Sequence, residues 1–177
     1  MKKKLVIVAA LAAVMTVGMT DRLFASPVHP GGWGVGVLWG SSFGDNAFAD
    51  NSNVALSLKA PTMPVFWGIR VGTGGGDLRL GLQGDVYLLG SEIIPTLSWF
   101  LGIGAYGNIW LGDDFALGFG ARLPIGLTWQ PLNILEIFLN AAPQIGGFLY
   151  TAGDGGFEFP DNGAGFFGFE IGVRVWF

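Results

Sequence analysis

The stretch Gly168-Phe-Glu-Ile-Gly-Val-Arg-Val-Trp-Phe177 ends the chain and decides the fold. Large apolar residues stand at every second position from Phe169 to Phe177, and Glu170 and Arg174 stand between them. A period of two is the period of a β-strand, because its successive side chains point to opposite faces of the sheet. The stretch therefore predicts a strand with one apolar face and one face that carries charge.

The same alternation runs through the chain upstream of this stretch. We count eight such segments, at residues 33–39, 54–60, 65–72, 78–89, 97–109, 115–129, 134–145 and 166–177. One face of each segment carries no charge, and the other face carries glycines and all of the charges. We expect the polar residues of the charged face to form one network inside the fold. They are Lys59, Arg70, Arg79, Asp85, Arg122, Glu136, Asn140, Glu170 and Arg174.

The bulk of the side chains decides which face points outward. An eight-stranded barrel has room inside for little more than its own side chains, so the many Trp, Phe, Leu and Ile residues fit better outside. Apolar-out and polar-in is the pattern of transmembrane barrels, and backbone groups in lipid are all paired only if the sheet closes. Residues 26–177 therefore predict an all-β fold, an eight-stranded antiparallel up-and-down transmembrane β-barrel.

The first 25 residues are typical of a cleaved signal peptide. Lys2, Lys3 and Lys4 precede an apolar stretch at residues 5–19, and a cut after Ala25 starts the mature chain at Ser26. An uncleaved anchor is the alternative. Cleavage removes four of the nine basic and one of the thirteen acidic residues, which leaves a net charge of −7. With no basic patch in the remainder, we expect no nucleic-acid partner.

Tryptophans gather at the ends of the predicted strands, where we expect two aromatic belts at the membrane surfaces. The short connections between the segments are at residues 61–64, 90–96 and 130–133. Trp67, Trp99 and Trp129 fall beside them and Trp176 falls at the strand end on the same side, whereas Trp39 and Trp110 fall at the opposite end. Pro124 interrupts the segment 115–129. Because proline cannot donate to a strand ladder, we expect a bulge there.

Counting along the segments predicts neighbours within the polar network. Glu136 falls beside Arg174, and Asn140 falls between Arg122 and Glu170. Lys59 and Asp85 flank Phe66. Arg70 and Arg79 have no acid nearby in this count, so we expect a small anion or water beside them. The remaining charges read as structural ion pairs that plug the lumen.

Other chemistry is poorly represented in the sequence. The chain has no cysteine and one histidine, His29, so we expect no catalytic site, cofactor or metal. Thr73-Gly-Gly-Gly-Asp77 lacks the Gly-Lys-Ser/Thr ending of a phosphate loop and reads as a tight hairpin. We expect the acidic residues of the loops to be solvated, and calcium binding is the alternative. They are Asp45, Asp50, Asp113, Asp114, Asp154, Glu158 and Asp161.

The C-terminal run resembles the last strand of bacterial outer-membrane barrels, which usually ends in an aromatic residue that the barrel-assembly machinery recognises. That resemblance implies an assembly signal at Phe177. Leu56-Ser-Leu-Lys-Ala-Pro, Phe66-Trp-Gly-Ile-Arg and Gly120-Ala-Arg-Leu-Pro-Ile-Gly-Leu-Thr-Trp-Gln-Pro resemble a family of small outer-membrane barrels of spirochaetes, and more broadly the OmpA, OmpX and OmpW types. The family implies outer-membrane lipid and the assembly machinery as partners, and no catalytic residues.

The expected function is that of a monomeric integral outer-membrane protein with a structural or surface-interaction role, a plugged lumen and acidic outer loops that face an unidentified extracellular ligand. A narrow pore or carrier for small or apolar solutes is the alternative, since inward glycines such as Gly34, Gly68 and Gly120 leave space. An enzyme is disfavoured because no histidine falls on a strand or outer loop.

Overall fold

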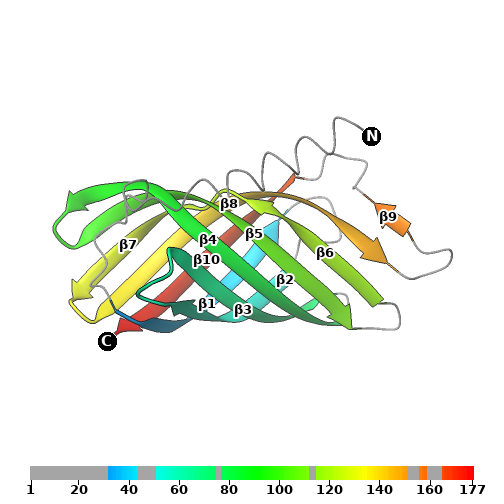
Figure 1. Ribbon diagram of the computed structural model, residues 1–177, viewed down its shortest axis with the longest axis horizontal. Helices are drawn as coiled ribbons and strands as arrows, with labels where there is room; N and C mark the ends of the chain where they lie inside the picture. The colour runs from blue at the N-terminus through cyan, green and yellow to red at the C-terminus, as the bar shows by residue number, and fades with distance from the viewer. Residues whose placement is uncertain (1–31, 44–50, 75–76, 112–114, 151–155, 159–164) are drawn as a thin grey trace.

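The computed structural model describes residues 32–43, 51–74, 77–111, 115–150, 156–158 and 165–177, and all their regular elements are β-strands (Figure 1). The strands are β1 (Gly34–Phe43), β2 (Asn51–Lys59), β3 (Val65–Gly74), β4 (Asp77–Ile94), β5 (Leu97–Leu111), β6 (Phe115–Arg122), β7 (Ile125–Leu132), β8 (Leu135–Tyr150), β9 (Gly156–Glu158) and β10 (Gly165–Trp176). Within these ranges no helix has the length and apolar character needed to cross a membrane. The predicted signal peptide, His29 and most of the acidic loop residues lie outside the described residues.

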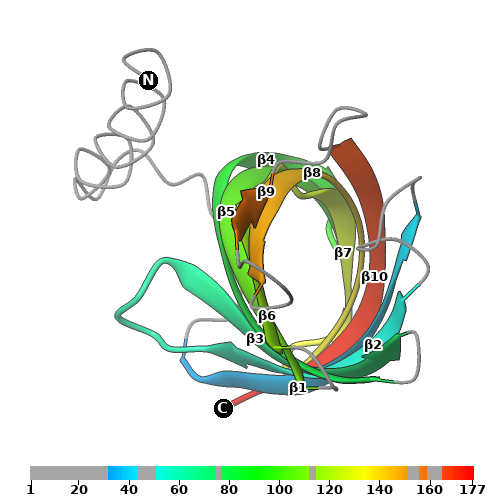
Figure 2. The same ribbon diagram turned by 90° about the vertical axis from the view of Figure 1, so that its right-hand side faces the viewer.

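The strands pair antiparallel into a ring with eight positions (Figure 2). Consecutive strands pair from β1 to β5, and β6 and β7 lie end to end between β5 and β8. The ring closes where β10 pairs with both β8 and β1. Trp33 and Phe177 exchange two backbone hydrogen bonds of 2.8 and 3.0 Å at that seam. The all-β prediction and the eight antiparallel positions are thus confirmed.

Several strands are longer than the alternation predicted. β4 reaches Ile94, so the connection expected at residues 90–96 is mostly strand that ends in a tight turn at residues 95 and 96. β8 continues to Tyr150, and β9 pairs with its end in the stretch between the predicted segments 134–145 and 166–177. The longer strands arise because the ladder continues through glycine and polar residues that interrupt the apolar pattern.

Pro124 does not produce the expected bulge, so that prediction was wrong. Arg122 pairs with Gly104 and Ile125 pairs with Leu101, so both strands advance by three residues across the proline. Gly102 N donates to Pro124 O at 2.7 Å, and proline, which has no N–H, cannot return that bond. The ladder therefore loses one hydrogen bond and keeps its register. The register shifts lie in β4, between Tyr87 and Leu89 and between Glu92 and Ile94, and in β7 after Trp129.

The two faces of the ring differ in chemistry. Its outer surface consists of exposed Leu, Ile, Val, Phe and Trp side chains, contributed by every one of the ring strands. Buried side chains lie on the inner face, where Phe66, Tyr87 and Phe100 stack with ring centroids 4.2 and 4.0 Å apart. The interior is therefore a packed core of aromatic and charged residues.

Inward glycines make room for this core. A Cβ added at Gly126 would lie 2.6 Å from Cζ of Phe100, and one at Gly68 would lie 2.8 Å from Cγ of Gln83. Real Cβ atoms do not approach other atoms so closely, so each of these glycines is needed for the large side chain opposite it. At Gly68 and Gly126 the space that inward glycines were expected to leave is filled by the side chains opposite them.

Candidate functional site

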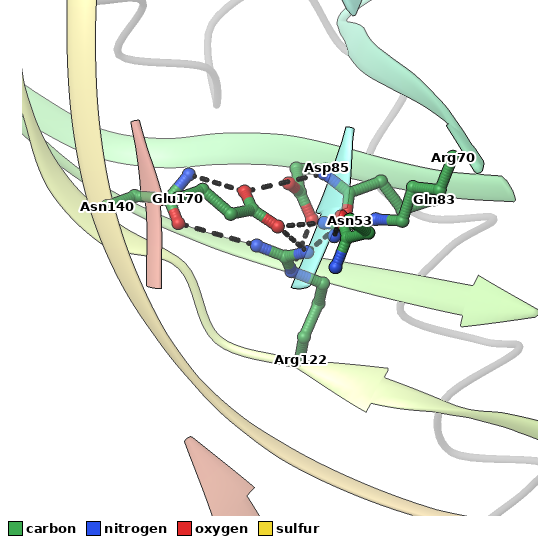
Figure 3. Close-up of polar contacts among 7 residues, drawn as sticks. All are labelled: Asn53, Arg70, Gln83, Asp85, Arg122, Asn140 and Glu170. Atoms are coloured by element: carbon green, nitrogen blue, oxygen red, sulfur yellow. Dashed lines mark hydrogen bonds and ion pairs between the residues drawn. The ribbon is translucent and has the colours of Figure 1, made fainter. Parts of the chain in front are cut away.

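Glu170 on β10 lies at the centre of the charged residues inside the ring (Figure 3). Its Oε1 accepts a hydrogen bond of 2.6 Å from Nη1 of Arg122 and forms an ion pair with Arg70. Its Oε2 accepts a hydrogen bond of 2.9 Å from Nδ2 of Asn140. One buried carboxylate therefore connects four strands of the ring, β3, β6, β8 and β10.

Three further side chains complete this central cluster. Nε of Arg122 lies 3.2 Å from Oδ1 of Asp85, and the Oε1 atom of Gln83 accepts hydrogen bonds from both Arg70 and Arg122. Nη1 of Arg70 donates to Oδ1 of Asn53 at 2.6 Å. Two arginines and two carboxylates thus balance each other's charge in an interior where an unpaired charge is costly.

A second cluster lies nearer the short turns and is centred on Glu136, which is fully buried. Oε1 of Glu136 accepts from Nη1 of Arg174 at 2.9 Å and from Oγ1 of Thr128 at 2.8 Å, and Oε2 accepts from Nε1 of Trp176 at 2.8 Å. Nε of Arg174 donates to Oγ of Ser57 at 2.8 Å. The residues of this cluster come from β2, β7, β8 and β10, so their hydrogen bonds join four strands.

The guanidinium of Arg174 also packs between two aromatic rings. It lies 4.0 Å from the ring centroid of Phe138 and 4.7 Å from that of Phe66. Desolvated cation–π contacts of this kind add to an ion pair rather than replace it. Arg174 therefore fills the width of the interior at this level.

The two remaining inward cations lie at opposite ends of the ring. Lys59 donates to the carbonyl oxygens of Ala60, at 2.9 Å, and Met63, and so closes the turn after β2. Arg79 on β4 is buried, with its guanidinium 5.6 Å from the ring centroid of Trp110. Neither forms an ion pair with a described residue.

The predicted neighbours Glu136 and Arg174 lie in contact, and Asn140 lies between Arg122 and Glu170 as expected. The expectation that Arg70 has no acid nearby was wrong, because Glu170 forms an ion pair with it. These two residues are on strands that do not pair with each other. They meet across the interior, which a count along neighbouring strands does not reveal.

Two of the tryptophans assigned to the belts point inward instead. Trp176 is 3% exposed and is hydrogen-bonded to Glu136, and Trp110 lies opposite the inward Arg79. The two tryptophans were assigned to the belts because they lie near strand ends. Whether a side chain faces inward or outward depends instead on the alternation along the strand. Trp176 follows the outward Val175 and must therefore point inward.

The other four tryptophans face outward. Trp67, Trp99 and Trp129 lie near the short turns, and Nε1 of Trp99 donates to Oγ of Ser91 at 2.7 Å. Trp39 faces outward in the middle of β1, opposite Ile171, rather than at a strand end. Phenylalanines occupy the rim instead: Phe43 packs against Phe169 with centroids 5.9 Å apart, and Phe167 lies 6.2 Å from Phe169. The predicted belts had not included them.

Polar residues without charge complete both clusters, and the sequence prediction did not include them. They are Ser57, Gln83, Thr128 and Asn53, all buried on the inner face. Ser57 and Asn53 share their face of β2 with Lys59, and Gln83 shares its face of β4 with Asp85. Thr128 falls on the same face of the predicted segment 115–129 as Arg122. That alternation was a usable signal for all four.

The arrangement offers ionic and hydrogen-bonding contacts between buried side chains. In the part of the chain that the structure describes, no three His, Cys, Asp or Glu residues come close enough together to hold a metal ion. Comparison of the chain with protein-family models, curated proteins and solved structures gave no match, so the resemblance to the spirochaete barrels stays a prediction.

Proposed function

We propose that this chain is an integral outer-membrane β-barrel protein with a structural or surface-interaction role and a lumen that is plugged by its own side chains. Its place in a diderm cell envelope, its export by the signal peptide at residues 1–25 and recognition of Phe177 by the assembly machinery belong to the same proposal. Phe177 is 73% exposed at the seam of the ring, where an assembly factor has access to it.

One observation carries the proposal: the ring is apolar outside and charged inside. A closed ring pairs its backbone groups internally, which removes the main cost of placing strands in lipid. The exposed outer face carries Ile171, Leu82, Phe119 and similar residues around the whole circumference. In water such a surface would drive aggregation, because soluble monomers rarely expose apolar patches beyond a few hundred Å².

The filled interior favours the structural role over the alternative of a pore or carrier. The Glu170 cluster spans the ring. The Glu136 cluster and the stacked Phe66, Tyr87 and Phe100 fill the part of the interior nearer the short turns. A conducting path would require these buried and paired side chains to separate. We therefore expect the exposed ends of the ring, rather than its interior, to contact other macromolecules.

Membrane fractionation of cells that express the full chain tests the proposal. The mature protein should fractionate with the outer membrane and resist extraction by salt and by carbonate. Unheated samples in detergent should migrate differently from heated ones on gels, because a closed ring of strands resists unfolding by detergent alone. Recovery of folded protein as a soluble periplasmic species would reject the proposal.

The start of the mature chain provides a second, independent measurement. Mass spectrometry of the purified protein should give the mass of a chain that begins at Ser26. A mature protein that keeps residues 1–25 would show that they act as an anchor, and it would overturn the export part of the proposal while leaving the ring itself untouched.

A further inference from the structure

A cavity lies inside the ring beyond the Glu170 cluster, at the end away from the short turns. Its volume is about 20 Å³, and its lining includes Arg79, Asn53, Gln83, Tyr106, Asn108 and Ser42. None of the described residues that line it is acidic. A polar cavity with a buried arginine and no carboxylate has the chemistry of an anion site.

The hydrogen bonds of the lining amides set which of their atoms remain available. Oδ1 of Asn53 accepts from Arg70, and Oε1 of Gln83 accepts from both Arg70 and Arg122. Because arginine only donates, these contacts identify the amide oxygens. The NH₂ group of Asn53 is left as a donor, and that of Gln83 keeps one N–H, since the other donates to Oε2 of Glu170 at 3.5 Å. The floor of the cavity therefore still offers N–H groups.

Arg79 supplies the charge. It is 7% exposed, and no hydrogen bond or ion pair joins it to a described residue. Its guanidinium carbon lies 5.6 Å from the ring centroid of Trp110, a contact that uses none of its N–H groups as hydrogen-bond donors to oxygen. A buried cation without a carboxylate is otherwise costly, so an anion at this site would stabilise it.

We propose that this cavity binds a small solute oxyanion, a phosphate, sulfate or carboxylate, with Arg79 as the charged donor and the amides of Asn53, Gln83 and Asn108 around it. The two carboxylates of the central cluster are already occupied by Arg70 and Arg122, so they do not compete for Arg79. The central cluster closes the cavity toward the short turns. The site is therefore a dead-end pocket that binds its ligand and does not pass it on.

Titration calorimetry of the full mature protein in lipid-free non-ionic detergent tests this site. Sodium phosphate, sodium sulfate and sodium acetate are each titrated at constant ionic strength against sodium chloride. We expect saturable one-to-one binding of at least one of the three. In Arg79→Gln the affinity for that anion should fall at least about tenfold, since a charge-assisted hydrogen bond is lost.

Lys59→Gln is the matched control, because it also removes one inward cation but lies at the opposite end of the ring. It should bind the anion as the wild type does. Asn108→Ala tests the site without changing its charge and should weaken binding several-fold. Each variant is first checked for the heat-dependent gel mobility of the wild type, and Arg79→Lys, which keeps the charge but loses the planar fork, replaces Arg79→Gln if that variant does not fold.

Two results would overturn the proposal: no saturable binding of any of the three anions, or equal weakening by Arg79→Gln and Lys59→Gln, which indicates a general effect of charge. Neither result bears on membrane insertion, since the measurement is made in detergent. Failure of the anion site and failure of the outer-membrane assignment are therefore distinguishable.

Discussion

Trp176 donates a hydrogen bond of 2.8 Å from its Nε1 atom to Oε2 of Glu136, so the last tryptophan of the chain holds a buried carboxylate. The other oxygen of that carboxylate accepts from Arg174 and Thr128. Both oxygens are therefore satisfied, by donors that come from β7 and β10 to a residue on β8. The arrangement makes Glu136 a point where a single change should affect three strands.

Replacing Glu136 with alanine should lower the free energy of unfolding by about 3–5 kcal/mol, because Arg174 is left buried without its counter-charge. Denaturant unfolding of the purified protein in detergent, followed by tryptophan fluorescence, measures this loss. The double variant Glu136→Ala with Arg174→Met should recover part of it. A Glu136→Ala protein as stable as the wild type would show that the pair does not hold the ring together.

Trp176→Phe is the conservative companion to that experiment. It keeps an aromatic ring inside but leaves Oε2 of Glu136 without its donor, which should cost about 1.5–3 kcal/mol, the worth of a hydrogen bond to a charged group. If instead Trp176 pointed to lipid, as its position along the strand had indicated, the substitution would change stability very little.

Gly126→Ala should destabilise the protein by about 1–3 kcal/mol, the usual cost of overpacking a core. The added Cβ would lie 2.6 Å from Cζ of Phe100 and 2.8 Å from Cβ of Asn140. Gly107→Ala is the matched control, because an added Cβ there meets nothing closer than Gly118 O at 3.9 Å. Equal stability of the two variants in thermal unfolding would argue against a packed interior.

Ile171→Arg tests the lipid face. Ile171 is exposed in the middle of β10, opposite Trp39 and Leu139, and a charge there should cost about 2–4 kcal/mol in a bilayer. Ile94→Arg, at the exposed end of the β4–β5 hairpin, should cost only about 0–1 kcal/mol, as charges near a membrane surface do. Folding into lipid vesicles at a series of denaturant concentrations measures both, and equal costs would show that no apolar band lies at mid-height.

The plugged interior should conduct ions poorly. In planar bilayers the purified wild type should give no steady, large single-channel currents. The double variant Arg122→Ala with Glu170→Ala removes two side chains from the centre and leaves Arg70 to balance Asp85, so it should conduct more than the wild type. Large currents from the wild type itself would favour the pore over the structural role.

The alternation of the sequence predicted the eight ring positions and the inner face well, because strand period and burial follow directly from side-chain order. It also predicted that Glu136 lies beside Arg174, because these residues are ladder neighbours on β8 and β10. Arg70 and Glu170 lie on strands that are not neighbours, and their contact depends on how far side chains reach across the interior. Whether the two side chains meet is set by the width of the ring, which the sequence pattern does not contain.

Pro124 illustrates a different limit. Proline's missing N–H removes one hydrogen bond from the ladder, and a bulge is one way to accommodate that loss. Here the neighbouring bonds from Gly102 and Leu123 hold the register, so the chain accepts one unmade bond instead. The choice depends on the packing of the buried proline ring, which a one-dimensional pattern does not contain.

The pairing of β1 with β10 has a consequence for how the protein is made. Gly34 pairs with Trp176, so the seam joins residues from the two ends of the chain, and their contact has nearly the highest sequence separation available. Contacts of this kind form late and slowly, because the entropy of closing the whole intervening chain is paid before they contribute. A chain that lacks β10 would leave an edge of β1 and an edge of β8 unpaired, and such an open sheet is prone to aggregate.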